Sequence, residues 1–237
     1  MGKREKSERP KPTRQITPGG IVLRAFLLAS ILWFFVPWFW NLLTVSGCGF
    51  FDGMPASAER QLASLHRRLE TGEPGFMQKL HPEGRLFCHS FYGFSVVNVA
   101  VSTTPGSDLR RWAVRELEWM IASVEECAGI DEFPRFTTLR PKGGIISAAQ
   151  ANLLRGGYVL LGGKREDIIR EFHDVSGLLF AEFMKTQTGS LETFPRMVWP
   201  VDNSCALESL RLHDVLFGTT YSRACRKWER WMAEHLD

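Results

Sequence analysis

The sequence predicts an all-α protein in which one N-terminal transmembrane helix is followed by stacked helical hairpins. Three observations carry this prediction. Residues 25–47 are 23 consecutive residues without a charge. Most segments beyond them repeat apolar residues every three to four positions, which is the period of an α-helix. No two segments show the alternation of apolar and polar residues that paired strands require.

The uncharged segment 25–47 is long enough to cross a membrane. A bilayer core about 30 Å thick needs about 20 residues of helix, and helical hydrogen bonds satisfy the backbone in lipid. Pro37 removes one backbone donor and predicts a kink, while Trp33, Trp38 and Trp40 suit the interface with water. A buried core helix is the alternative, but it needs a partner on every face and leaves the adjacent step in charge unexplained.

The charge distribution predicts the orientation of this segment. Seven basic and two acidic residues precede Cys48, which leaves 22 basic and 24 acidic residues after it. Lys and Arg beside a span stay on the cytoplasmic side. We therefore expect residues 1–24 to be a disordered basic cytoplasmic tail, and residues 48–237 to be a domain on the outer, periplasmic or extracellular, side. The domain itself is slightly acidic, so a nucleic-acid partner has no electrostatic support.

The sequence at the end of the uncharged segment is compatible with two outcomes, cleavage before Cys48 or an uncleaved anchor. Val45-Ser46-Gly47-Cys48 resembles a lipobox, in which the chain is cut before a lipid-bearing cysteine. The apolar stretch is longer than the 7–15 residues of a secretory signal peptide, which favours an uncleaved single-pass anchor. Membrane lipid is the expected partner in either case.

The first part of the domain predicts three helices. Residues 57–71 place Leu62, Leu65 and Leu69 on one stripe of an amphipathic helix. Prolines and glycines predict a loop over 72–87. The valines of residues 89–103 fit either a strand or a buried helix, and we favour the buried helix. A helix capped by Ser107 or Asp108 is expected over 108–127.

The second part predicts four more helices. Small and apolar residues favour a closely packed inner helix over 145–161, where the pair Gly156-Gly157 permits close approach. The apolar spacing predicts an amphipathic helix over 165–185. Residues Asp202-Asn203-Ser204 are expected to cap a helix over 203–216, and a last helix is expected over 220–235.

One segment carries a family resemblance. The sequence WPVDNSCALESL, residues 199–210, resembles the start of an inner helix in the α/α-toroid superfamily, which includes six-hairpin glycoside hydrolases and the linalool dehydratase/isomerase type. The resemblance covers about 15 residues closely, and no catalytic motif of the family carries over residue by residue. It implies a partial α/α-toroid-like fold, because only about three and a half hairpins are predicted. Such a piece is expected to form a homo-oligomer or to complete its fold with a partner chain.

In that architecture the N-termini of inner helices meet around a cavity, and helix N-termini favour anions and polar ligands. Candidate catalytic residues lie at two such ends, namely Asp202, Cys205, Glu208, His89 and Tyr92. Asp202 and Glu208 could act as acid and base, and His89 could pair with Cys205 or Cys88 as base and nucleophile. Structural roles compete with each assignment: a helix cap for Asp202, a small buried apolar group for Cys205 and a helix anchor for Tyr92.

No cofactor or metal site is expected. The five cysteines lack C-x-x-C spacing and the six histidines are dispersed. Gly162-Gly163-Lys164 is not a phosphate loop, because Arg165 stands where such a loop needs Ser or Thr. Two functions therefore compete: an enzyme-like or binding domain for a carbohydrate or another small polar molecule, and a non-catalytic envelope scaffold.

Overall fold

The all-α prediction is confirmed. The computed structural model describes residues 56–129 and 144–235, together with residues 26, 29, 30, 33, 35 and 36. Its contacts divide the chain into two units, Met1–Gly49 and Phe50–Asp237. Within the described residues there is no strand, and the only β-type pairing is an isolated bridge between Phe194 and Met197.

Most of the predicted membrane segment 25–47, and all of the tail 1–24, lie outside the described residues. Among the residues that are described, no helix combines the length and the apolar character that crossing a bilayer requires. The six described residues of this segment are helical.

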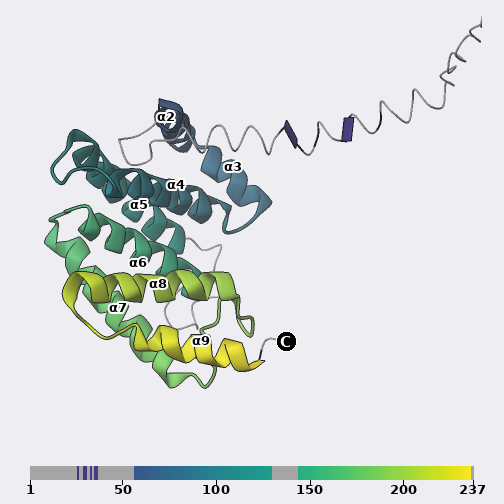
Figure 1. Ribbon diagram of the computed structural model, residues 1–237, viewed down its shortest axis with the longest axis vertical. Coiled ribbons are helices and arrows are strands. Elements are labelled where there is room, and N and C mark those ends of the chain that lie inside the picture. The colour runs from purple at the N-terminus through teal and green to yellow at the C-terminus, as the bar shows by residue number, and fades with distance from the viewer. Residues whose placement is uncertain are drawn as a thin grey trace, which may run out of the picture. The chain divides into compact units, whose positions relative to one another are not determined.

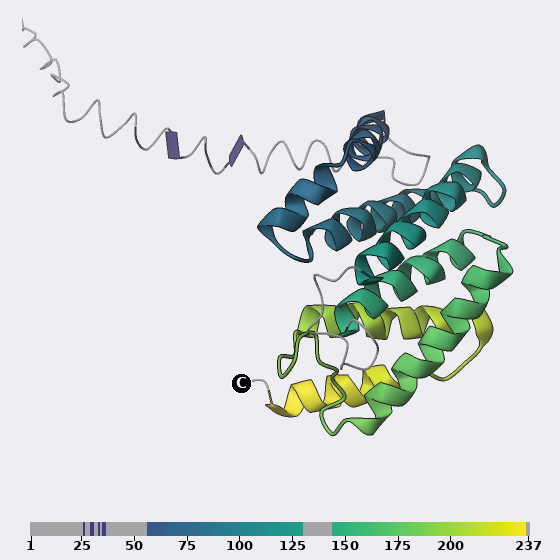
Figure 2. The same ribbon diagram turned by 180° about the vertical axis from the view of Figure 1, so that it is seen from behind.

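Eight helices form the described part of the second unit (Figures 1 and 2). Their bounds are α2 Ala56–Glu70, α3 Glu73–Leu80, α4 Gly84–Val101, α5 Asp108–Gly129, α6 Gly144–Leu160, α7 Glu166–Lys185, α8 Pro200–Phe217 and α9 Arg223–His235.

Helices α4, α6 and α8 form a parallel inner row. Gly93 of α4 faces Leu154 of α6, and Val97 of α4 faces Gly157 of α6. Residue numbers therefore rise in the same direction along both helices, which run parallel. In the same way, residues 150 and 152 of α6 contact residues 205 and 209 of α8. Figure 1 shows the three helices stacked one below another, with α5 between α4 and α6. The predicted hairpin stacking is therefore present in this part of the chain.

Glycines bring the inner row together, as the sequence predicted. A Cβ on Gly157 would lie 2.6 Å from Cγ2 of Val97, and a Cβ on Gly156 would lie 2.6 Å from Cδ2 of Leu212. Side chains at these two positions would therefore force α6 away from α4 and from α8. Gly162 instead ends the α6 region with a φ of 93°, a conformation that other residues rarely adopt.

Two local predictions were wrong. The loop expected over 72–87 contains α3, because Pro74 lies in the first turn, where its missing N–H is not needed. The helix expected from 203 begins at Pro200, and its N-cap residue Trp199 makes no side-chain cap bond. Asp202 therefore lies within the first turn instead of capping it.

The expected cap by Ser107 is confirmed, since its hydroxyl accepts the N–H of Arg110 at 3.3 Å.

A buried polar contact ties α6, α7 and α8 together. The side-chain amide of Asn152 donates to the hydroxyl of Ser176 at 3.0 Å and to that of Ser209 at 2.9 Å. All three residues are fully buried. Because water cannot replace a lost partner there, these bonds select one arrangement of the three helices.

Replacing Asn152 with Ala should lower the free energy of unfolding by about 1–3 kcal/mol, the usual cost of leaving buried polar groups unpaired. Chemical denaturation monitored by circular dichroism measures this change. The matched control is Asn98→Ala, since Asn98 is an exposed residue of α4. Equal effects of the two substitutions would contradict a stabilising role for the buried contact.

Candidate functional site

A cluster of three polar side chains joins α2, α4 and α5. Tyr92 donates its hydroxyl hydrogen bond to Oε2 of Glu116 at 2.8 Å, and the same oxygen lies 2.9 Å from Nδ1 of His66. The Tyr92 hydroxyl is also 3.4 Å from His66 Nδ1. On its other side, His66 Nε2 lies 3.3 Å from Oε1 of Glu70. Glu116 is thus a carboxylate oriented by two partners from different helices.

Local sequence explains how each member reaches the cluster. The apolar stripe of α2 places Leu62 in the core, and His66 follows one helical turn later. Tyr92 is buried on α4, and Glu116 precedes the buried residue Leu117 of α5. Helices α4 and α5 are antiparallel, since Arg85 near the start of α4 pairs with Glu126 near the end of α5.

These side chains line a groove of about 800 Å³ between α2, α4 and α5. Its wall combines apolar, aromatic and charged groups: Glu59, Arg60, Leu62, Ala63, His66, Arg67, Tyr92, Asp108, Leu109, Trp112 and Glu116. This mixture of a mainly apolar wall and a few convergent polar groups is typical of small-molecule sites.

The environment of Tyr92 keeps its hydroxyl protonated. Burial raises the pKa of the Tyr92 phenol strongly, and the hydrogen bond to Glu116 raises it further. Tyr92 therefore acts as a hydrogen-bond donor rather than as a proton donor at neutral pH. Its bond leaves the second oxygen of Glu116 available to a ligand.

Asp202 and Cys205 lie elsewhere, in the first two turns of α8. Asp202 is 2% exposed, and its Oδ2 has no hydrogen-bond partner among the described residues. Gln150 donates to the sulfur of Cys205 at 3.9 Å, while its own Oε1 is likewise buried without a partner. Asp202 Oδ2 and Gln150 Oε1 are thus two buried acceptors without a donor in the described part of the structure.

Burial raises the pKa of Asp202, a hydrogen bond from Thr193 opposes this effect, and the negative charge of Glu83 adds to it. Burial also raises the pKa of the Cys205 thiol, with a further contribution from Asp202. A thiol whose pKa is raised is a poor nucleophile. The environment of Cys205 therefore does not activate it.

His89 and Glu208 each have partners other than Asp202 and Cys205. The ring of His89 is buried, with Nδ1 2.8 Å from the carbonyl oxygen of Arg85 in its own helix, and burial lowers its pKa. The side chain of Glu208 is 61% exposed, with Oε2 3.8 Å from Nε of Arg211. Asp202 and Glu208 thus occupy different environments, one buried and one open to water.

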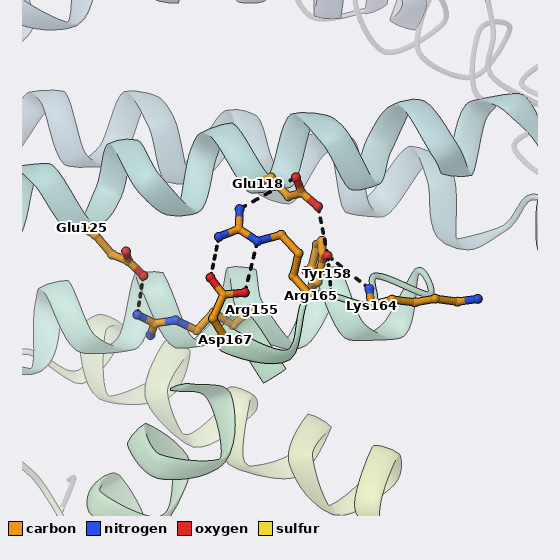
Figure 3. A network of polar contacts seen from close by, with 7 residues as sticks. All are labelled: Glu118, Glu125, Arg155, Tyr158, Lys164, Arg165 and Asp167. Carbon is orange, nitrogen blue, oxygen red and sulfur yellow. Dashed lines mark hydrogen bonds and ion pairs between the residues drawn. The ribbon is translucent and has the colours of Figure 1, made fainter. Parts of the chain in front are cut away.

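A second polar region lies between α5, α6 and α7 (Figure 3). It surrounds a cleft of about 460 Å³, in which buried Arg155 donates to Glu125 at 2.6 Å. The hydroxyl of Tyr158 accepts the backbone N–H groups of Lys164 and Arg165, at 3.1 and 3.0 Å, and donates to Glu118. These bonds hold the connection between α6 and α7.

Figure 3 also shows Arg165 paired with Asp167. Because Arg155 and Arg165 are already matched by carboxylates, we assign this network to the fold.

No group of three potential metal-ligating side chains occurs within residues 56–129 and 144–235 or the few described positions before them. The four cysteines described there, Cys88, Cys127, Cys205 and Cys225, are free thiols. Cys48, the expected lipid-bearing residue, lies outside the described part of the chain.

Sequence reasoning found Tyr92 but missed His66 and Glu116. The three residues are 24 to 50 positions apart, and no local spacing links them. Only the antiparallel register of α4 and α5, and the position of α2 across them, brings them together. A tyrosine and a glutamate on two adjacent predicted helices were the available signal.

Neither a scan against protein-family models nor a search of curated proteins found a match to this chain.

Proposed function

We propose that this chain is a membrane-anchored helical-hairpin domain on the non-cytoplasmic side, which binds a carbohydrate or another small polar molecule in the groove between α2, α4 and α5. The observation that carries the binding role is Glu116, a carboxylate that is fixed by Tyr92 and His66 in the wall of that groove.

The chemistry of the groove suits a sugar. Sugars combine hydroxyl groups with apolar C–H faces, so they are bound by carboxylates together with aromatic rings. Glu116 supplies the carboxylate, and Trp112 supplies a half-buried aromatic ring in the same groove. Arg60 and Arg67 add hydrogen-bond donors from α2.

The membrane anchor rests on the composition of segment 25–47, which has 23 residues without a charge. The side chains of Phe26, Trp33, Phe35 and Val36 belong to helical residues and are 53–79% exposed. Large apolar groups gain free energy when they leave water for lipid, at about 25 cal/mol per Å². The positive charge that precedes them favours the orientation with the domain outside.

One observation favours a second candidate function, a scaffold that docks a partner chain. Met197, Val198, Trp199 and Val201 at the start of α8 are consecutive or nearly so, and each is 47–61% exposed. Exposed apolar groups gathered in one place are typical of interaction surfaces. This surface is distinct from the groove residues, so the two functions can be tested separately.

The Glu116→Gln variant tests the binding role. A panel of neutral and acidic mono- and disaccharides is titrated into the full-length protein in detergent by calorimetry. Loss of a charged hydrogen-bond acceptor, worth about 1.5–3 kcal/mol, should weaken the best binder about 10- to 150-fold. Tyr92→Phe should weaken it less, because Tyr92 acts by orienting Glu116.

The control is Glu126→Gln, an exposed glutamate of the same helix that pairs with Arg85, and it should bind like the wild type. Unfolding temperatures confirm that each variant is folded. Binding that is equal for Glu116→Gln and wild type, or a panel in which nothing binds, would overturn the proposed role and leave the scaffold as the better account.

A further inference from the structure

A chain of hydrogen bonds runs from an exposed histidine to the turn before α9. Nδ1 of His173 on α7 lies 2.9 Å from Nε2 of His213 on α8. Nδ1 of His213 lies 2.8 Å from the hydroxyl of Thr219, which donates to Oδ1 of Asp214 at 2.5 Å. His173 is exposed and His213 is 1% exposed. These hydrogen bonds thus connect a residue in contact with bulk water to the protein interior.

Asp214 holds the far end of this chain. Its Oδ1 accepts the backbone N–H of Tyr221 at 2.7 Å, and its Oδ2 accepts that of Ser222 at 2.8 Å. These two residues directly precede α9, so Asp214 fixes where that helix begins. Thr219 is therefore the link between the histidine pair and the turn that positions α9.

The directions of these bonds follow from proton counting. Thr219 uses its hydrogen for Asp214, so its oxygen accepts from Nδ1–H of His213. Nε2 of neutral His213 is then an acceptor for Nδ1–H of His173. One extra proton on the two histidines leaves this hydrogen bond intact, because Nδ1–H of a charged His173 still donates to Nε2 of neutral His213. A second proton leaves two charged donors 2.9 Å apart with no acceptor between them.

The surroundings of His213 resist that second proton. Its ring is enclosed by the rings of Phe172, Phe217 and Tyr221, with centroids 5.0, 5.0 and 5.1 Å away. Burial lowers the pKa of His213, the charge of His173 lowers it further, and Asp214 opposes both, which together bring this pKa to about 4. Among the described residues, His173 of α7, Asp214 of α8 and Tyr221 of the α8–α9 connection are the ionisable groups that act on it.

Asp214 itself stays charged throughout the relevant range. Burial alone would raise its pKa, but the hydrogen bonds from Thr219, Ser222 and Tyr221 outweigh burial and lower it. As the pH falls, His213 is therefore protonated before Asp214 is.

We propose that the His173–His213–Thr219–Asp214 chain is an acid-operated latch, which fixes the α8–α9 connection and α9 at neutral pH and releases them when both imidazoles become charged. The latch depends neither on a ligand in the groove nor on the membrane anchor.

The pH dependence of release follows from the difference in proton binding between the latched and the released states. A released His213 titrates near the ordinary histidine value of about 6.5, whereas the latched residue titrates near 4. Between these values the released state binds one more proton, so release becomes more favourable as the pH falls. The opening equilibrium should rise about tenfold per pH unit from about pH 6.5 to about pH 4, and should level off below.

Hydrogen–deuterium exchange of the full-length protein in detergent tests the latch. The peptide that covers residues 218–235 is followed between pH 7 and pH 4, after correction for the intrinsic exchange rate. The wild type should show the tenfold rise per pH unit in this peptide. His213→Gln should abolish the rise, because glutamine can accept and donate but does not titrate.

His173→Gln is a second variant in case the buried substitution impairs folding. In this variant the rise should level off at a higher pH than in the wild type, because the charge of His173 no longer lowers the pKa of His213. His81→Gln, at an exposed histidine before α4, should leave the rise unchanged. A flat profile in the wild type, or a profile in both latch variants that is the same as that of the wild type, would overturn the proposal.

Discussion

Replacing Leu154 with Ala is expected to lower the free energy of unfolding by about 2–5 kcal/mol, the range found for large-to-small changes in a closed core. Leu154 is fully buried in the centre of α6, where its Cδ2 packs against the backbone of Gly93 in α4. The lost contacts therefore weaken the inner row itself. Chemical denaturation measures the change, and half-buried Leu153 provides the control, with a clearly smaller expected loss for Leu153→Ala.

A double-mutant cycle makes this test specific to the contact between α4 and α6. A Cβ on Gly93 would lie 2.5 Å from Cδ2 of Leu154, so Gly93→Ala alone should cost about 1–3 kcal/mol through overpacking. In the Leu154→Ala background the new methyl group has room, and its cost should fall substantially. Strictly additive effects would mean that the two residues do not share this contact.

The second large effect is expected in the N-terminal segment. The double substitution Ile31→Arg and Leu32→Arg places two charges inside segment 25–47, about a third of the way along it. Each arginine at the centre of a membrane helix costs about 2.5–3.5 kcal/mol on the insertion scale. The pair should therefore move most of the full-length protein out of the carbonate-resistant membrane fraction, as measured by quantitative immunoblotting.

Ile31→Ala with Leu32→Ala is the matched control, because it shortens the same two side chains without adding charge. This variant should remain in the membrane fraction. If the arginine variant also remains there, segment 25–47 does not anchor the protein by insertion.

Periodicity and composition were enough to predict most of the helices. Residues 57–71, 108–127 and 165–185 each show one apolar stripe, and the structure places α2, α5 and α7 there. Helix α3 was missed because Pro74 and Gly75 resemble a loop signal, although proline in a first turn costs a helix little. The start of α8 was misplaced for a related reason, since Asp202 resembles a cap but lies two residues inside the helix.

The polar clusters could not be predicted from local sequence. Tyr92 attracted interest on its own, but its partners His66 and Glu116 come from helices before and after it. His173 and His213 are 40 residues apart and meet only because α7 and α8 pack side by side. Such contacts depend on the register between helices, which is fixed by packing details such as Gly156 against Leu212.

A topology reporter pair fused after Asp237 tests most directly whether the helical domain is displayed on the non-cytoplasmic side of a membrane. Alkaline phosphatase is active only outside, and green fluorescent protein is fluorescent only in the cytosol. Display on the non-cytoplasmic side predicts phosphatase activity without fluorescence. Fluorescence without phosphatase activity would contradict it.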